Sequence, residues 1–418
     1  MSSGTGGASR GGGVLVAALA IDSLGQGLFL PLSLVYFTEL TPVPLALLGV
    51  LLSVANLITL PIPVWAGAMA DRFGALPVVV AAQVMQAVGF FAYAWVSGPV
   101  GIFLAASLVA LGVRFFWSAI FTAVADYADN STSQRGTDTW YAISNGARTA
   151  GLAAGGLLTG VVVADGREAA YRAVAYGAAV CFALAAVLIA AFVRTGQPRR
   201  RPSTAPGPGY AALVRDRPFL GLVALNTVYA LSSLMLGLAL PTVVLSGIEG
   251  PSWLTASILA GNAILIAVLS APVARRLAGR RRTRSLVGAA VLWSGWCALM
   301  ATLVPGQLGW VIPVLLLATL LFTAAELTHA PVSNGLAASM APVQARGRYL
   351  AVFQYSFTIA SIASIAAPAF FGALFEVDHA APWLALGLAN AVTIAGLLLL
   401  EGRLPTHVLR DSAEQRTG

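Results

Sequence analysis

Apolar runs long enough to cross a lipid bilayer recur along almost the whole chain of 418 residues. A helix needs about 20 apolar residues to span the hydrocarbon core. Lipid offers no hydrogen-bond partners, so a spanning segment must satisfy its own backbone groups, which favours helices. The runs predict twelve membrane-spanning helices, at 14–38, 45–69, 76–97, 100–126, 137–163, 170–194, 218–245, 253–277, 284–304, 309–339, 344–374 and 381–401.

Composition supports this prediction, because 58% of the residues are hydrophobic and only 10% are charged. Soluble domains carry roughly 25% charged residues. We therefore predict an all-α integral membrane protein. A Pro-rich, basic interruption separates six runs from six, and short loops in the two halves weakly resemble each other, which favours two six-helix bundles related by pseudo-two-fold symmetry. The predicted parts are a disordered cytoplasmic N-terminus at 1–13, one bundle at 14–194, a cytoplasmic linker at 195–217, the second bundle at 218–402 and a cytoplasmic tail at 403–418.

The basic residues are all arginine, and their placement predicts the orientation. If the N-terminus is cytoplasmic, nearly all arginines outside the membrane fall on the cytoplasmic side, and only Arg167 and Arg172 fall on the other. This asymmetry follows the positive-inside rule and places both termini in the cytoplasm. It also accounts for the net charge of +8 without a nucleic acid.

Four charged residues lie deep inside apolar runs: Asp22, Arg114, Arg148 and Glu326. Around Asp22 the sequence reads VAALAIDSLGQGLFLP, in which only Ser23 and Gln26 are also polar. A charge within a bilayer is costly unless it is paired, protonated or in contact with water. These four residues are therefore candidates for function.

The segment GAMADRFGALP, at 67–77, resembles the signature loop of the major facilitator superfamily. Ala75 and Leu76 replace the basic residues usual in the family. The resemblance implies a cytoplasmic latch, in which the acid faces the start of the eleventh span, and an acid near the end of the fourth span fits the same pattern. The residues assigned to this latch are Gly67, Asp71, Arg72, Gly74, Asp126 and Arg346.

The segment ARTAGLAAGGLLTG, at 147–160, resembles the antiporter motif of the same family. Gly151, Gly155 and Gly156 match the motif, whereas Ala147 and Leu152 replace its first Gly and its Pro. The resemblance implies a helix at the interface of the two halves, as in exporters of the family. A generic packing face of small residues is the alternative interpretation.

The tenth span carries Glu326 and His329, which are three residues apart and therefore share a helix face. With the later segment RGRY, at 346–349, it looks like a bacterial group of multidrug exporters in this superfamily. That resemblance implies the bacterial cytoplasmic membrane as the location. His329 is a candidate proton relay, with a polar packing residue as the alternative.

In this family the first, fourth, seventh and tenth spans line a central cavity, which implies that Asp22, Arg114 and Glu326 face the same water-filled space. Asp22 is then either a protonation site whose partner is Arg114 or one half of a static pair with it. Proton coupling is assigned to Asp22, Glu326, Arg114 and His329. The substrate cavity is assigned to Gln26, Arg114, Phe115, Arg148 and Glu326, although Phe115 fits a lipid-facing position equally well.

The leading functional hypothesis is proton-coupled export of a lipophilic small molecule by alternating access. Import or uniport of a small, possibly anionic, metabolite is the alternative in the same fold, and a receptor or scaffold is the alternative from another class. No nucleotide-binding loop, metal cluster or nucleophile triad is present in the sequence, so we expect neither an enzyme nor a cofactor. The expected partners are the substrate, protons and the bilayer, for a chain that acts as a monomer.

Overall fold

The computed structural model describes residues 9–30, 32, 35–131, 133, 135–163, 166–195, 209–244, 252–303 and 308–410, and this part of the chain is built from helices. The predicted all-α fold is therefore confirmed. Two compact units divide the chain, and each also includes a short segment from the opposite half of the sequence. Unit 1 comprises Met1–Arg135, Ile143–Pro208 and Ala341–Val352, and unit 2 comprises Gly136–Ala142, Gly209–Met340 and Phe353–Gly418.

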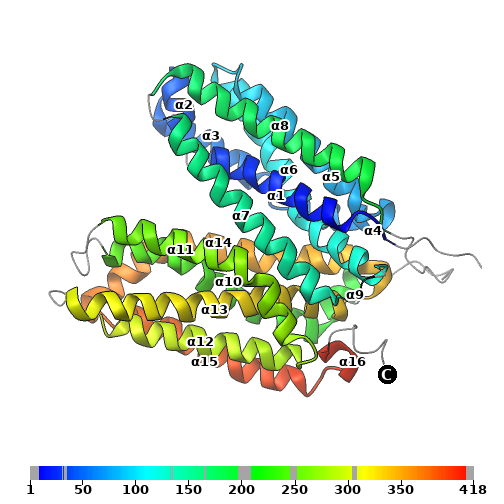
Figure 1. Ribbon diagram of the computed structural model, residues 1–418, viewed down its shortest axis with the longest axis vertical. Coiled ribbons are helices and arrows are strands. Elements are labelled where there is room, and N and C mark those ends of the chain that lie inside the picture. Colours follow the sequence, from blue (N-terminus) through cyan, green and yellow to red (C-terminus); the bar gives the residue numbers. More distant parts are fainter. Residues whose placement is uncertain are drawn as a thin grey trace, which may run out of the picture. The chain divides into compact units, whose positions relative to one another are not determined.

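Eight helices belong wholly or mostly to unit 1 and run from blue to green in Figure 1. They are α1 (Gly12–Phe29), α2 (Val35–Leu40), α3 (Leu45–Leu57), α4 (Ile62–Phe73), α5 (Ala75–Tyr93), α6 (Pro99–Asp129), α7 (Thr137–Val162) and α8 (Glu168–Phe192). Helix α5 packs against α6 and α8, and α1 packs against α8. Stacked and edge-on aromatic rings from α1, α2, α5 and α8 fill the core, including Phe29, Tyr36, Phe90 and Phe182.

The later α-helices belong wholly or mostly to unit 2. They are α9 (Tyr210–Arg215), α10 (Arg217–Thr242), α11 (Ser252–Leu277), α12 (Arg282–Ala301), α13 (Leu308–Met340), α14 (Arg346–Val377), α15 (Ala381–Glu401) and α16 (Thr406–Leu409). The short 3-10 helix η2 (Val343–Ala345) and the first turns of α14 belong to unit 1. Helix α12 packs against α13 and α15, and Trp293, Trp296 and Trp383 are fully buried there.

Nine helices within the described residues are long and apolar enough to cross a membrane, and the bent pair α3 and α4 brings the number to ten. Helices α7 and α14 are the two other long helices, of 26 and 32 residues. Large apolar side chains on the outside of the helices, such as Val100, Leu157 and Val161, are more than two thirds exposed. Such a surface suits contact with lipid.

Some predicted boundaries differ from the structure. The predicted span 45–69 is two helices bent by 42°. Pro61 and Pro63 lie at the break, and because proline has no backbone N–H, it interrupts helical hydrogen bonding. The predicted span 14–38 is likewise divided into α1 and α2.

The predicted polar segments are partly ordered. In the segment 1–13, the Ser9 N–H donates to the Asn130 carbonyl at 2.9 Å, and Arg10 pairs with Arg194 through two backbone hydrogen bonds. The linker contains α9, and the C-terminal tail contains α16. Residues 1–8, 196–208 and 411–418, and the junction of the seventh and eighth spans at 245–251, lie outside the described residues.

Candidate functional site

Asp22 is completely buried on α1 and is held by two amide side chains. The Gln26 Nε2 atom, one helical turn away, donates to Oδ2 at 3.0 Å, and the Gln83 Nε2 atom on α5 donates to Oδ1 at 3.2 Å. Each carboxylate oxygen therefore has one neutral donor. Gln26 was predicted to line a substrate cavity, and the interaction that the structure gives its side chain is this hydrogen bond to Asp22.

The cation that interacts electrostatically with Asp22 is Arg148 on α7, and no interaction joins Asp22 to Arg114 among the described residues. The predicted Asp22–Arg114 pair is therefore wrong. The two arginines lie at similar predicted depths, and only the rotation of each helix about its own axis decides which of them approaches Asp22. Arg114 forms other interactions from its place on α6, and Phe115 is half-buried beside it.

Arg148 approaches Asp22 because α7 and α1 pack backbone to backbone through glycines. A Cβ atom on Gly151 would collide with the Ala20 carbonyl, and one on Gly155 would collide with the Leu24 carbonyl. The Thr159 hydroxyl donates to the Leu28 carbonyl at 2.5 Å, which fixes the same contact. Both glycines were predicted to lie at the interface of the halves, and the contacts that the structure gives them are with α1 of the same unit.

Gly156, the third glycine of that motif, has more space than the other two. The nearest atom to a Cβ built on it is the Gly27 carbonyl oxygen, at 3.9 Å, which is an ordinary van der Waals distance. Two of the three motif glycines therefore have a packing role that a larger side chain would disrupt.

The guanidinium of Arg148 lies over two aromatic rings of α6. Its Cζ atom is 4.0 Å from the Trp117 ring centroid and 5.7 Å from that of Phe116. Both distances are within the range of cation–π attraction, which favours a charged guanidinium even where water is scarce. The Nε atom is buried and has no hydrogen-bond partner in the part of the chain that the structure describes.

Glu326 on α13 lies in unit 2 and accepts two hydrogen bonds. The Ser233 hydroxyl on α10 donates at 2.8 Å, and the Asn262 Nδ2 atom on α11 donates at 3.4 Å. The Thr323 hydroxyl donates to Asn262 Oδ1 at 2.7 Å and so orients the amide. Within the described residues no cation contacts this carboxyl group, in contrast to Asp22.

Among the described residues, His329 forms no hydrogen bond with Glu326, although the two share α13. Its Nε2 atom lies 2.8 Å from Asn226 Oδ1, and its ring packs against Tyr229 and Trp293, with centroids 4.8 Å and 5.3 Å away. A spacing of three residues permits contact, but here the ring turns into the aromatic core of unit 2. The structure therefore favours the polar packing interpretation over the proton relay.

Asp71, at the end of α4, accepts backbone hydrogen bonds from the first turn of α14. The Gly347 N–H donates at 2.6 Å and the Arg348 N–H at 3.3 Å, and Arg348 Nε lies 3.6 Å from the carboxylate. Unpaired N–H groups at a helix N-terminus favour an acid. The predicted contact of Asp71 with the start of the eleventh span is therefore present.

The same α4–α14 contact explains the glycines of the signature loop. A Cβ on Gly67 would lie 2.7 Å from the Gly347 carbonyl oxygen, too close for any side chain. Gly74 has a φ of 92°, which favours glycine, and it separates α4 from α5. Arg72 is exposed, with its guanidinium 5.2 Å from the Phe73 ring centroid.

Arg346 joins the end of α6 to the start of α14. Its Nη1 atom lies 3.1 Å from Asp126 Oδ1 and 2.7 Å from Asp129 Oδ2. Asp126 was predicted as part of the latch, whereas Asp129 was not identified. The α4–α14 contact and this ion-pair cluster both lie within unit 1, which includes residues 341–352.

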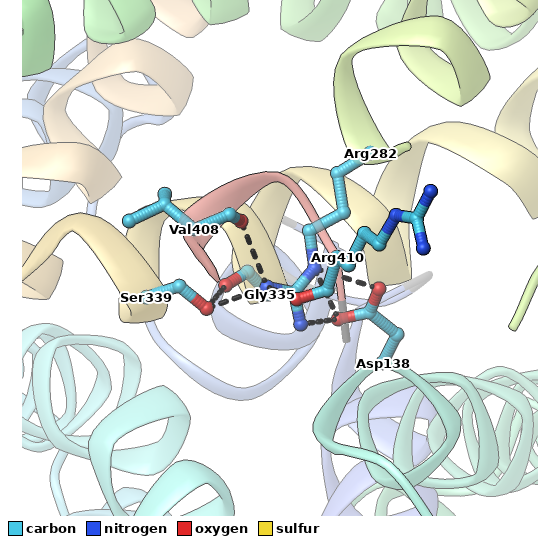
Figure 2. Close-up of polar contacts among 6 residues, drawn as sticks. All are labelled: Asp138, Arg282, Gly335, Ser339, Val408 and Arg410. Carbon is cyan, nitrogen blue, oxygen red and sulfur yellow. Dashed lines mark hydrogen bonds and ion pairs between the residues drawn. The ribbon is translucent and has the colours of Figure 1, made fainter. Parts of the chain in front are cut away.

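A second cluster of buried polar contacts, centred on Arg282 and Asp138, lies at the start of α7 in unit 2 and is shown in Figure 2. Arg282, only 2% exposed, donates to both carboxylate oxygens of Asp138 at 2.8 to 3.1 Å. Its Nη1 atom donates to the Ser339 hydroxyl at 2.6 Å and to the Val408 and Arg410 carbonyls at 3.2 and 3.3 Å. Gly335 leaves room for the Asp138 carboxylate, which a Cβ there would hit.

The sequence patterns did not identify Asp138 as a functional residue, and Arg282 was only one of the arginines that predict the orientation in the membrane. The weak resemblance between the loop after the eighth span and the signature loop was the one available hint that a polar contact is repeated there. No group of three or more potential metal ligands occurs among the residues that the structure describes.

Comparisons with known proteins agree on one family. The profile described as Major Facilitator Superfamily matches residues 15–368. The multidrug resistance protein MdtH of Photorhabdus laumondii is 26% identical over 382 residues, which cover 90% of each chain. The protein of the same name from Yersinia enterocolitica is 27% identical over 380 residues, again 90% of each chain.

Solved transporter structures share the fold. FucP in its outward conformation has a TM-score of 0.73 at 14% identity, covering 93% of this chain and 98% of its own. The human organic anion transporter MFSD10 has a TM-score of 0.66 at 17% identity, covering 92% and 98%. Because the family profile covers most of the residues and the fold agrees, this chain belongs to the Major Facilitator Superfamily, whose members are membrane transporters rather than enzymes.

Proposed function

We propose that this transporter exports a lipophilic small molecule in exchange for protons, by alternating access. The observation that carries the proposal is the environment of Glu326, a carboxyl group in an apolar helix bundle that, among the described residues, has Ser233 and Asn262 as its hydrogen-bond partners. A carboxyl group without a cation partner can gain and lose a proton as its solvation changes. Such a group can couple substrate exit to proton entry.

Asp22 supplies a second candidate protonation site, in the other unit. Its neutral donors Gln26 and Gln83 serve an ionised carboxylate, and the charge of Arg148 also favours that form. The relatives named multidrug resistance proteins support export of lipophilic compounds.

Uptake of a small anionic metabolite together with a proton is the second candidate. Arg148, which lies against the Trp117 ring, favours it, because a guanidinium within the membrane suits an anionic group.

The direction of proton movement separates these candidates. We expect purified protein in liposomes loaded with a pH-sensitive dye to move protons opposite to an added lipophilic drug, in proportion to drug concentration. Protein-free liposomes and liposomes whose pH gradient is collapsed by an ionophore are the controls. Protons that move with the compound would indicate symport, and no movement with a broad compound panel would favour a receptor or scaffold.

We also propose that the protein acts as a monomer in the bacterial cytoplasmic membrane, with both termini in the cytoplasm. The asymmetric arginines carry the part of this proposal that concerns the orientation of the termini. Reporter fusions active only in the cytoplasm should be active at both ends, and fusions active only in the periplasm should be silent at both. A periplasmic signal at one end alone would mean that the number of spans is odd and would direct attention to the segment 241–253.

We further propose that the α4–α14 contact is a gate that must break and re-form in each cycle. Asp71→Asn removes the charge that faces the α14 N-terminus while keeping the side chain's shape. We expect transport to slow several-fold and the distance distribution between spin labels at Phe73→Cys and Gln344→Cys, both exposed, to broaden. Asp378→Asn, in an exposed turn, is the control, and an unchanged distribution with Asp71→Asn would contradict the gate.

A further inference from the structure

The guanidinium of Arg148 has donors that no described residue uses. Its Nε atom is buried without a partner. The side chain as a whole is half-buried, and its terminal nitrogens form no hydrogen bond with the described residues, so these nitrogens are open to the surroundings. An arginine at this depth cannot lose its charge and cannot face lipid at low cost, so the open side must meet water or a ligand.

The local geometry orients the open edge of the guanidinium. The Trp117 ring lies against the group, with its centroid 4.0 Å from Cζ, and Phe116 lies nearby. The N–H donors of a guanidinium all lie in the plane of the group, and such a planar set of donors matches the two oxygens of a carboxylate. The Trp117 ring also stacks on Phe121, but the side chain is only half-buried, and its exposed part offers an apolar surface beside the guanidinium for the rest of a ligand.

Asp22 does not occupy this donor edge. Its two oxygens accept from Gln26 and Gln83, and it interacts with Arg148 only through its charge, without a hydrogen bond or ion pair. Asp22 therefore offsets part of the positive charge of Arg148 electrostatically but accepts no hydrogen bond from the guanidinium. An ionised Asp22 repels a bound anion, so removing this charge should strengthen anion binding.

From these observations we propose that Arg148 and Trp117 form a subsite in unit 1 for a carboxylate-bearing substrate with an aromatic or other flat apolar body. This inference rests on the proposed transport function, and it narrows the substrate class to lipophilic acids and to amphoteric compounds that carry an acid group. Arg148 binds the acid group, and Trp117 packs against the apolar body.

The test compares three probes with the same body and different head groups: pyrenebutyrate, pyrenebutyramide and pyrenebutylamine. Binding to full-length protein in phosphatidylcholine nanodiscs is followed by energy transfer from tryptophan to pyrene. We expect the carboxylate to bind about tenfold more tightly than the neutral amide, since hydrogen bonds to charged groups are the stronger ones. Addition of phosphatidylglycerol should not change this ratio, whereas loss of carboxylate binding would identify an anionic lipid as the occupant and overturn the proposal.

Variants test whether the preference for the carboxylate probe depends on the proposed residues. Arg148→Gln should abolish this preference, and Trp117→Leu should weaken the binding of all three probes while keeping the preference. Asp22→Asn should increase carboxylate affinity by at least threefold. Arg172→Gln removes an exposed arginine of the same unit, paired with Glu168, and should change nothing.

A second measurement does not depend on whether the variants fold. In the wild-type protein, bound pyrenebutyrate should protect Arg148 from phenylglyoxal, as detected by mass spectrometry, and should leave Arg172 reactive. Equal affinity for carboxylate and amide, or a preference that survives Arg148→Gln, would overturn the subsite. Proton-coupled transport without a head-group preference would refute the subsite and leave the proposed function intact. Head-group-selective binding without transport would support the subsite and refute the proposed function.

Discussion

Glu326→Gln is expected to abolish proton-driven transport while leaving substrate binding and the fold intact. Glutamine keeps the shape of the side chain and its amide oxygen can still accept from Ser233, but its NH2 group takes the place of the oxygen that accepts from Asn262, and the amide cannot release a proton. We expect uptake driven by a pH gradient into inside-out vesicles to fall by at least about tenfold, as a group that must be protonated and deprotonated in each cycle is lost. Downhill exchange of substrate should stay within about threefold of the wild type, because it needs no proton step.

Three further variants locate the coupling. Asp22→Asn should reduce coupling less than Glu326→Gln if Asp22 mainly moderates the charge of Arg148, and as much if both carboxyl groups carry protons. Glu39→Gln, on the exposed surface of α2, is the matched control and should behave as the wild type. Normal proton movement by the Asp22→Asn/Glu326→Gln double variant would eliminate the proposed mechanism.

The helices and one polar contact could be predicted from the sequence because both depend on local pattern. Long apolar runs must form helices in lipid whatever their neighbours are. The contact of Asp71 with the first turn of α14 was implied by the resemblance of a short loop to a family motif, and glycines permit the close approach. The bend between α3 and α4 was not predicted, because proline is tolerated within membrane helices and the presence of Pro61 and Pro63 does not by itself specify a break.

Side-chain pairing inside the units could not be predicted, because it depends on how each helix is rotated. Asp22 interacts with Arg148 rather than Arg114 since glycines bring α7 onto α1. The same limit applies within a basic segment. Arg281 and Arg284 have side chains 50% and 60% exposed, whereas the Arg282 side chain between them is 2% exposed, and only packing distinguishes the three.

Arg282→Met is expected to destabilise unit 2 strongly, because it leaves the Asp138 carboxylate without its bidentate partner. The substitution also removes the donor to Ser339 and to the Val408 and Arg410 carbonyls that fix the C-terminal segment (Figure 2). Removing one member of a buried ion pair lowers the free energy of unfolding by about 3–5 kcal/mol. For a domain of this size the midpoint of thermal unfolding should fall by on the order of 10 °C.

Two native cysteines make the measurement specific to one unit. Cys297 lies on α12, the helix that begins at Arg282, and is 1% exposed, whereas Cys181 is in unit 1. In a Cys181→Ala background, labelling of Cys297 by a thiol-reactive dye during heating reports the unfolding of unit 2 alone. The Arg282→Met and wild-type proteins are compared in the same detergent at the same heating rate.

The neighbouring arginine is the matched control. Arg281 also pairs with an acid, Glu401 at 2.8 Å, but its side chain is half exposed, and exposed pairs contribute at most about 1 kcal/mol. Arg281→Gln should therefore shift the midpoint by no more than a few degrees. The double variant Asp138→Leu/Arg282→Met should recover most of the loss, because replacing both members of a buried pair by apolar groups is often neutral or stabilising. Equal shifts for Arg281→Gln and Arg282→Met would mean that the cluster around Arg282 contributes no more than a surface ion pair.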